Sequence, residues 1–175
     1  MVTEADAPRR IVKEINGLPA AAEYARLIGV EVHELNPKRF AASPVVVMID
    51  GTDYARSIKK ANPDGSLTFF CAIEEGLVLR VAHGVDLVQG LERTFDHIRA
   101  EMGQPQLVLA CDCLLRNLEV SANGLKARVG EVFQHNHAVG FSSFGEQFHG
   151  IHVNQTLTGI AIGTLPDATP EAHSE

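Results

Sequence analysis

The sequence lacks any apolar run long enough to cross a membrane. A transmembrane helix needs about 20 consecutive apolar residues, and the apolar runs here, such as PVVVMI and LVLAC, are far shorter. The opening stretch, MVTEADAPRR, contains no apolar segment of the kind found in a signal peptide. We therefore expect no membrane association and a cytoplasmic location.

Clusters of basic residues are also missing. The chain has 22 acidic and 15 basic residues, which gives a formal net charge of −7. Surfaces that bind nucleic acid carry an excess of positive charge, and anionic lipids attract runs of Lys and Arg. The charge balance therefore argues against nucleic acid and acidic lipid as partners.

Cysteine is scarce, and the common motifs of catalysis and nucleotide binding are absent. The cysteines are Cys71, Cys111 and Cys113, an odd number that favours reduced thiols in a reducing compartment. No Walker pattern and no G-x-G-x-x-G after a strand is present to hold phosphates. A G-x-S-x-G nucleophile turn is missing as well.

The remaining composition is that of an ordinary globular domain. The chain has 175 residues, of which 45% are hydrophobic and 21% charged, and this length favours one domain. The patterned region predicts a domain at residues 10–163. Residues 1–9 and 164–175 lack apolar periodicity and are expected to be a flexible N-terminus and a flexible tail.

Strand patterns dominate the first half of the chain. Residues 10–15 and 44–49 read as strands, with a short helix at 20–28 that ends at Gly29. Three further runs, at 54–58, 67–73 and 77–82, are separated by the turn sequences NPDG and EEG. Such turns favour an antiparallel meander of three strands.

The second half mixes helices and strands. Apolar residues recur every three or four positions within 87–102 and again within 118–132, which predicts two amphipathic helices. A strand is expected at 106–111, and two or three more within 138–144 and 151–163. The apolar faces of these helices need a sheet to cover. The predicted class is therefore α+β, a largely antiparallel sheet with two main helices on one face and one short N-terminal helix.

Two cysteines form the first candidate chemical group. On a strand, Cys111 and Cys113 point to the same face, and with His149 or His152 they would make a metal site. Structural zinc sites usually contain Cys-x2-Cys pairs, and none is present. The same thiols beside a histidine base would make a nucleophile. The alternative is that buried cysteine serves as a small apolar residue.

Histidine is frequent, with eight in the chain. A neutral imidazole in an apolar pocket could hold haem iron, so a haem site is a second possibility. Ordinary surface or hydrogen-bonded histidines are the alternative. The sequence does not place a haem ligand on any one histidine.

The stretch at 139–158 is rich in glycine, aromatic and polar residues. Glu146 directly follows Gly145, where its carboxylate could meet a ligand amine or a guanidinium, and Asn154 and Thr156 could line the same edge. The alternative is a tight β-hairpin whose polar side chains bind turn amides.

Arg116 lies near a predicted strand-to-helix junction, four residues after Asp112. Its guanidinium is suited to a carboxylate. That carboxylate could belong to a ligand, to Glu119 or to Glu146.

These stretches together resemble the C-terminal half of the FIST sensory domain family, in the family's order and over roughly residues 10–163. The matching stretches are NGLPA at 16–20 with Tyr24 and Gly29, residues 54–58 followed by DGSL at 64–67 and Glu75-Gly76, Cys113 to Arg116, VGF at 139–141, FGE at 144–146 and HVNQT at 152–156. No single stretch is specific, but their order and spacing together are.

The resemblance implies an intracellular sensor of small molecules, and not an enzyme. FIST modules occur beside histidine kinases, chemotaxis receptors and cyclic-dinucleotide enzymes. They are thought to bind small ligands, with amino acids proposed, and some members are haem proteins that respond to nitric oxide. The implied partners are a small-molecule ligand and an N-terminal FIST half or a signalling output domain. Without that half, an exposed apolar face would favour a homodimer.

Carried over residue by residue, the resemblance points to Gly145 and Glu146, with Cys113, Arg116 and Asn154 as neighbours. We hypothesise that Arg116 and Glu146 bind the carboxylate and the amine of a small zwitterion, because a partner for each charge makes a semi-buried site tolerable. Phe141 and Phe144 would supply the apolar wall. No cofactor or metal is expected. The alternatives are a haem-based nitric oxide sensor and an interaction module that pairs through its sheet edges.

Overall fold

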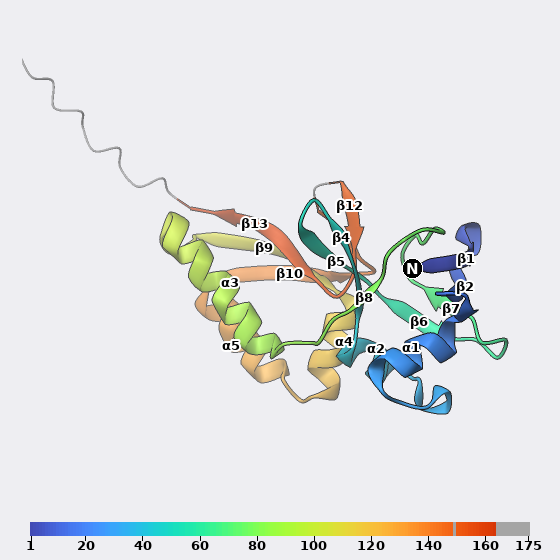
Figure 1. Ribbon diagram of the computed structural model, residues 1–175. Helices are drawn as coiled ribbons and strands as arrows, with labels where there is room; N and C mark the ends of the chain where they lie inside the picture. Colours follow the sequence, from blue (N-terminus) through green and yellow to red (C-terminus); the bar gives the residue numbers. More distant parts are fainter. Residues whose placement is uncertain (149, 164–175) are drawn as a thin grey trace, which may run out of the picture.

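The computed structural model describes residues 1–148 and 150–163, which form an N-terminal part (residues 1–85) and a C-terminal part (residues 86–163) lying side by side (Figure 1). Helices and strands are mixed, and all strand pairs except one are antiparallel among the described residues. This confirms the α+β class. Within the same residues, no helix has the length and apolar character needed to span a bilayer.

The N-terminal part contains a five-stranded antiparallel sheet. Its strands are β1 (Val2–Asp6), β2 (Ile11–Ile15), β3 (Leu18–Pro19), β6 (Ile58–Ala61) and β7 (Leu67–Phe69). The order is β1-β2-β7-β6, with β3 paired to β2. The turn from β2 to β3 places both Asn16 and Gly17 at positive φ, a conformation that Asn-Gly pairs adopt readily.

Two helices and a second sheet complete the N-terminal part. Helix α1 (Ala20–Ile28) ends where Gly29 takes the left-handed conformation, as expected, and α2 (Pro37–Ala42) follows. The second sheet has the order β5-β4-β8. Its strands are β4 (Val45–Ile49), β5 (Thr52–Arg56) and β8 (Arg80–Val81), and the short 3-10 helices are Ala7–Arg9 and Val32–Glu34.

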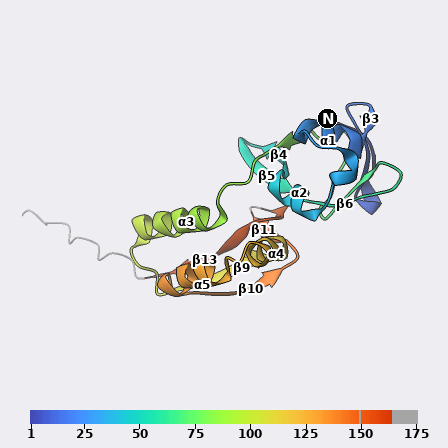
Figure 2. The ribbon, with the colours of Figure 1, turned by 90° about the horizontal axis from the view of Figure 1, so that it is seen from below.

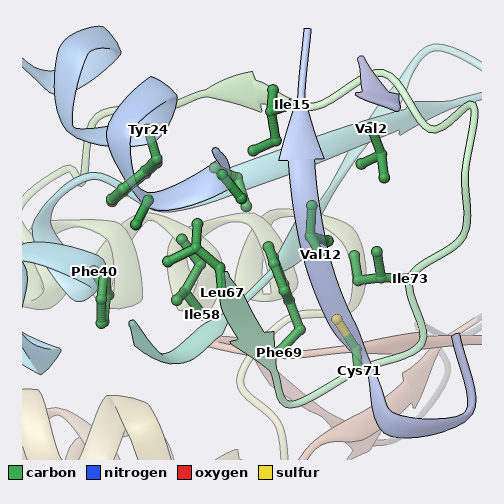
Figure 3. Close-up of a cluster of buried hydrophobic side chains, with 13 residues drawn as sticks. Val2, Val12, Ile15, Tyr24, Phe40, Ile58, Leu67, Phe69, Cys71 and Ile73 are labelled. Carbon is green, nitrogen blue, oxygen red and sulfur yellow. The ribbon is translucent and has the colours of Figure 1, made fainter. Parts of the chain in front are cut away.

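The main hydrophobic core lies between the five-stranded sheet and α1. Figure 3 shows its side chains converging from β1, β2, β6, β7 and both helices of this part. Tyr24 is almost fully buried and donates its hydroxyl to the Ser43 carbonyl at 2.7 Å. Burial raises the pKa of Tyr24 to about 12.

The C-terminal part is built on a three-stranded sheet with the order β10-β9-β13. Strands β9 (Leu107–Cys113) and β10 (Ala138–Ser143) are parallel, and β13 (Leu157–Ile162) is antiparallel to β9. A parallel pair needs a crossover connection, which α4 (Leu114–Ala122) and α5 (Lys126–His135) provide. A hairpin of β11 (Glu146–Phe148) and β12 (Ile151–Val153) lies between β10 and β13.

Helices cover one side of this sheet. Leu91 and Phe95 of α3 (Leu87–Met102) pack with Val108 of β9 and with apolar residues of α5. The rings of Phe95 and Phe133 meet edge to face at 6.1 Å. In Figure 1, α3 and α5 lie below the sheet, and Figure 2 shows both helices on the side nearer to the viewer. The other side of the sheet carries no helix of the described residues.

Three expectations differ from the structure. Residues 2–6 form strand β1, with Val2 in the core. The run at 77–82 does not extend the meander, because the Val2 amide donates to the Leu77 carbonyl and β8 pairs with β4. The second long helix is broken into α4 and α5 at Asn123-Gly124, where Gly124 has φ +67°. The expected tail at 164–175 lies outside the described residues.

Candidate functional site

Glu146 is buried at the start of β11, next to the carboxyl ends of β9 and β10. Its Oε1 accepts a hydrogen bond from the Ser143 hydroxyl at 2.5 Å, and its Oε2 accepts one from the Thr156 hydroxyl at 2.5 Å. Only 5% of the residue is exposed. Among the described residues no basic side chain forms an ion pair with it. Within residues 1–148 and 150–163, the carboxylate is therefore held by hydroxyl groups alone.

Asn154 and Gly145 lie against each other beside Glu146. The Asn154 side chain is fully buried and donates to the Phe144 carbonyl at 3.5 Å, while its Oδ1 has no partner in the described part of the chain. A Cβ at Gly145 would lie 2.2 Å from the His152 Nε2, and its φ is +143°. Glycine is required here because other residues rarely adopt this φ and because the His152 and Asn154 side chains occupy the place of a Cβ.

Cys113 and Arg116 flank the same region from the β9–α4 junction. Cys113 is fully buried, and its amide donates to the Thr156 carbonyl at 3.0 Å. The Arg116 Nε donates to Asp112 Oδ1 at 2.8 Å, so its structural partner is neither Glu119 nor Glu146. Burial raises the pKa of Glu119, and the Arg116 charge opposes that shift.

Phe141 and Phe144 point to the surface, with 60% and 82% of each residue exposed. The structure therefore brings four of the predicted residues together: Cys113, Gly145, Glu146 and Asn154. It places Arg116 beside them, paired to Asp112. Ser143 and Thr156 join the group. The sequence indicates Thr156 at the same edge, whereas nothing in the sequence marks Ser143.

A cavity of about 390 Å³ lies between the two parts of the chain, close to these residues. Its walls come from β5, from α3, from the hairpin β11–β12, and from the side of β9 and β13 that faces α3. We call it the central cavity. The lining residues are Thr52, Asp53, Tyr54, Ala55, Thr94, Phe95, Ile98, Val108, Ala110, Phe148, Val153, Thr156, Leu157, Thr158, Gly159 and Ala161. Pockets of roughly 300–1,000 Å³ are typical of small-molecule sites.

The chemistry of the central cavity is mainly apolar. Phe95, Val108 and Leu157 contribute apolar groups, and Thr52, Tyr54 and Thr94 are polar residues of the lining. Asp53 adds a carboxylate that forms an ion pair with Arg80. Neither Glu146 nor Arg116 is part of the lining. Thr156 connects the two features, because it borders the cavity and donates to Glu146.

The sequence did not indicate the central cavity. Phe95 belongs to the apolar stripe expected to face the core, and Tyr54 to an expected strand. No local signal shows that these elements meet around a hollow, because their contact depends on pairing between distant segments. Only the apolar stripe of α3 could have indicated that this helix contributes to a wall.

The metal alternative finds no support in the described residues. In residues 1–148 and 150–163, no group of three or more His, Cys, Asp or Glu side chains lies close enough to hold a metal ion. Cys111 is half-buried and Cys113 fully buried, and both are free thiols. His149, one of the histidines considered as a further ligand, lies outside the described residues.

Comparison with known proteins places the chain in a family. A family model described as the FIST C domain matches residues 20–149. No curated protein and no solved structure matches the chain. The matched region includes α1, the hairpin β6–β7, the β9–α4 junction and Glu146. Because it covers more than half of the sequence, the chain belongs to the FIST C domain family, whose members are sensory domains associated with signal transduction.

Proposed function

We propose that this protein is a sensory domain that binds a small molecule in the central cavity and does no chemistry on it. The observation that carries the proposal is the cavity itself, an apolar hollow of about 390 Å³ between the two parts of a chain from a sensory family. Large apolar pockets with a few polar groups are the usual ligand sites of proteins.

The lining favours a compact apolar ligand that carries one amine or hydroxyl group. Phe95, Ile98 and Leu157 would contact its apolar body. The Thr94 hydroxyl, on α3 next to Phe95, would bind its polar group. Amino acids with apolar side chains are candidates of this kind. The zwitterion clamp of Arg116 and Glu146 stays a prediction, and in this structure each of those groups already has an internal partner.

The position of the cavity offers a route for a signal. Tyr54 of the N-terminal part and Leu157 of the C-terminal part line the same space, so a ligand would contact both parts at once. Thr156 adds a link to the buried Glu146 and to the start of β11. A ligand that binds one arrangement of these elements better than another shifts the population toward it.

The test is a thermal-melting screen of the protein with small apolar amines and alcohols and with the twenty amino acids, followed by calorimetry. We expect one class of compounds to raise the melting temperature, because a ligand that binds only the folded state stabilises it. Thr94→Phe places a ring in the cavity wall and should abolish the rise. Ala100→Phe, on the exposed side of the same helix, is the matched control and should leave it unchanged.

Two outcomes would contradict the proposal. The first is that no compound in the screen raises the melting temperature of the protein. The second is that an active compound binds Thr94→Phe as tightly as it binds the unmodified chain, which would place the ligand elsewhere.

A further inference from the structure

The side of the β10-β9-β13 sheet that faces away from α3 and α5 is apolar and uncovered. We call it the open face. Its large side chains are between 36% and 65% exposed. They are Leu107 and Leu109 of β9, Val139 and Phe141 of β10, and Ile160 and Ile162 of β13. In Figure 1 this is the upper side of the sheet, opposite the two helices.

The strand register places these residues next to one another. Val139 and Ile160 are both paired with Leu109, which gives a continuous row of three apolar side chains across the sheet. The next row consists of Phe141, Cys111 and Thr158. No charged side chain alternates onto this side of the three strands, although the whole chain has a net charge of −7.

The size of the open face approaches that of a protein interface. Six large side chains with these exposures leave apolar surface on the order of 500 Å². The largest apolar patch of a typical monomer is roughly 300–600 Å². A stable interface buries about 800 Å² on each partner. The open face thus lies near the upper end of what a monomer ordinarily exposes.

We propose that the open face binds the open face of a second copy of this chain, forming a twofold-symmetric dimer in which two three-stranded sheets pack face to face. In a twofold interface the same patch serves both partners and must be self-complementary. An apolar surface without charged side chains meets that requirement. If the contact contained acidic side chains, the two identical chains would repel each other there. Packed sheets lie about 10 Å apart with side chains interdigitating, and Leu109 would lie near the centre.

This arrangement leaves the central cavity free. Val108 and Ala110, on the opposite side of β9, line the cavity, while Leu107 and Leu109 lie on the open face. The dimer and the ligand site can therefore be tested separately.

The experiment is sedimentation velocity and equilibrium on the full chain at concentrations up to about 100 µM, where a dissociation constant in the micromolar range gives mostly dimer. We expect a dimer. Ile160→Glu places like charges in the contact and should raise the dissociation constant at least a hundredfold. Val85→Glu alters a residue that is 71% exposed elsewhere on the surface, and should leave the dimer intact.

A milder variant, Ile160→Thr, covers the case in which Ile160→Glu fails to fold. Threonine keeps the strand propensity of the position, and the variant should weaken the dimer at least tenfold with an unchanged circular dichroism spectrum. A protein that stays monomeric at about 100 µM would overturn the proposal. So would a dimer that neither substitution at Ile160 weakens, because that dimer would use another surface.

Discussion

At the scale of single residues, Glu23 illustrates how one buried carboxyl group ties stability to pH. It lies on α1 with 1% of its side chain exposed, and accepts hydrogen bonds from Arg26 and from the Asn16 amide. These hydrogen bonds, that of Arg26 above all, lower the pKa of Glu23 from 4.5 to about 2. A carboxyl group with a lowered pKa stabilises the folded state above its unfolded pKa.

We therefore predict that the contribution of Glu23 is complete above about pH 4.5 and is lost as the pH falls toward 2. In urea unfolding at a series of pH values, Glu23→Gln should be less stable than the unmodified chain at neutral pH, and the gap should close in acid. Glu92→Gln, an exposed position on α3, serves as the control and should give a curve parallel to that of the unmodified chain. A gap for Glu23→Gln that stays constant down to pH 2 would contradict this account.

The sequence indicates which residues gather at the candidate site better than it indicates which residue each of them contacts. The burial of Glu146 and Asn154 beside Gly145 agrees with the expectation that these residues share one edge. The partner of Arg116 was not foreseen, because Asp112 is only one of several carboxylates within reach of a long side chain. Phe144 is 82% exposed, since an aromatic residue beside glycines can stand at a strand end as readily as in a pocket.

At the scale of elements, the pairing of β9 with β10 depends on a glycine. A Cβ at Gly140 would lie 1.9 Å from the Ala110 carbonyl oxygen, so the parallel strands could not keep their register. We predict that Gly140→Ala destabilises the protein by about 2 kcal/mol or more, because backbone cannot yield as a flexible side chain can. Thermal and urea unfolding measure this loss.

The matched substitution is Gly130→Ala in helix α5. A Cβ there has nothing within 4 Å, and alanine is the better helix former by about 0.5–1 kcal/mol. Gly130→Ala should therefore stabilise the protein slightly. If both substitutions have effects of the same sign and size, the close approach of β9 and β10 is not as described.

The positions of the helices and strands were largely predictable from the sequence, but the pairing of the strands was not. Helix α1, the turn before β7 and the amphipathic helix α3 follow from local patterns such as Gly29 and the sequence NPDG. The pairing of β8 with β4 depends on contacts across more than thirty residues, about which periodicity carries no information. The apolar spacing also continues through Asn123-Gly124, although the backbone turns there.

At the scale of the whole molecule, the loop after β12 connects the two parts. The Ser57 hydroxyl donates to Gln155 Oε1 at 3.0 Å, Gln155 Nε2 donates to the Ala41 carbonyl at 3.5 Å, and Arg56 Nη1 donates to the His152 carbonyl at 2.6 Å. A typical hydrogen bond contributes about 0.5–1.5 kcal/mol. Much of the polar contact between the parts therefore depends on one glutamine.

We predict that Gln155→Ala lowers the melting temperature by about 2–6 °C, as the loss of one to two hydrogen bonds implies for a chain of this size. Hydrogen exchange of the β11–β12 amides should become faster, while that of β2 and β7 stays unchanged. Gln147→Ala, an exposed position on β11, is the control and should change neither. Equal acceleration in both parts would show that Gln155 supports global stability and not the contact between them.

The walls of the central cavity come from segments of the chain that are synthesised at different times. Tyr54 lies early in the chain, whereas Leu157 and Ala161 lie in the last described strand. The core around β2 and β7 uses residues no later than Val81, and such a unit can form before the rest of the chain has been translated. The hollow between the parts lacks the wall that β13 forms until that strand has emerged. A growing chain would therefore acquire its folded core well before it could recognise a ligand.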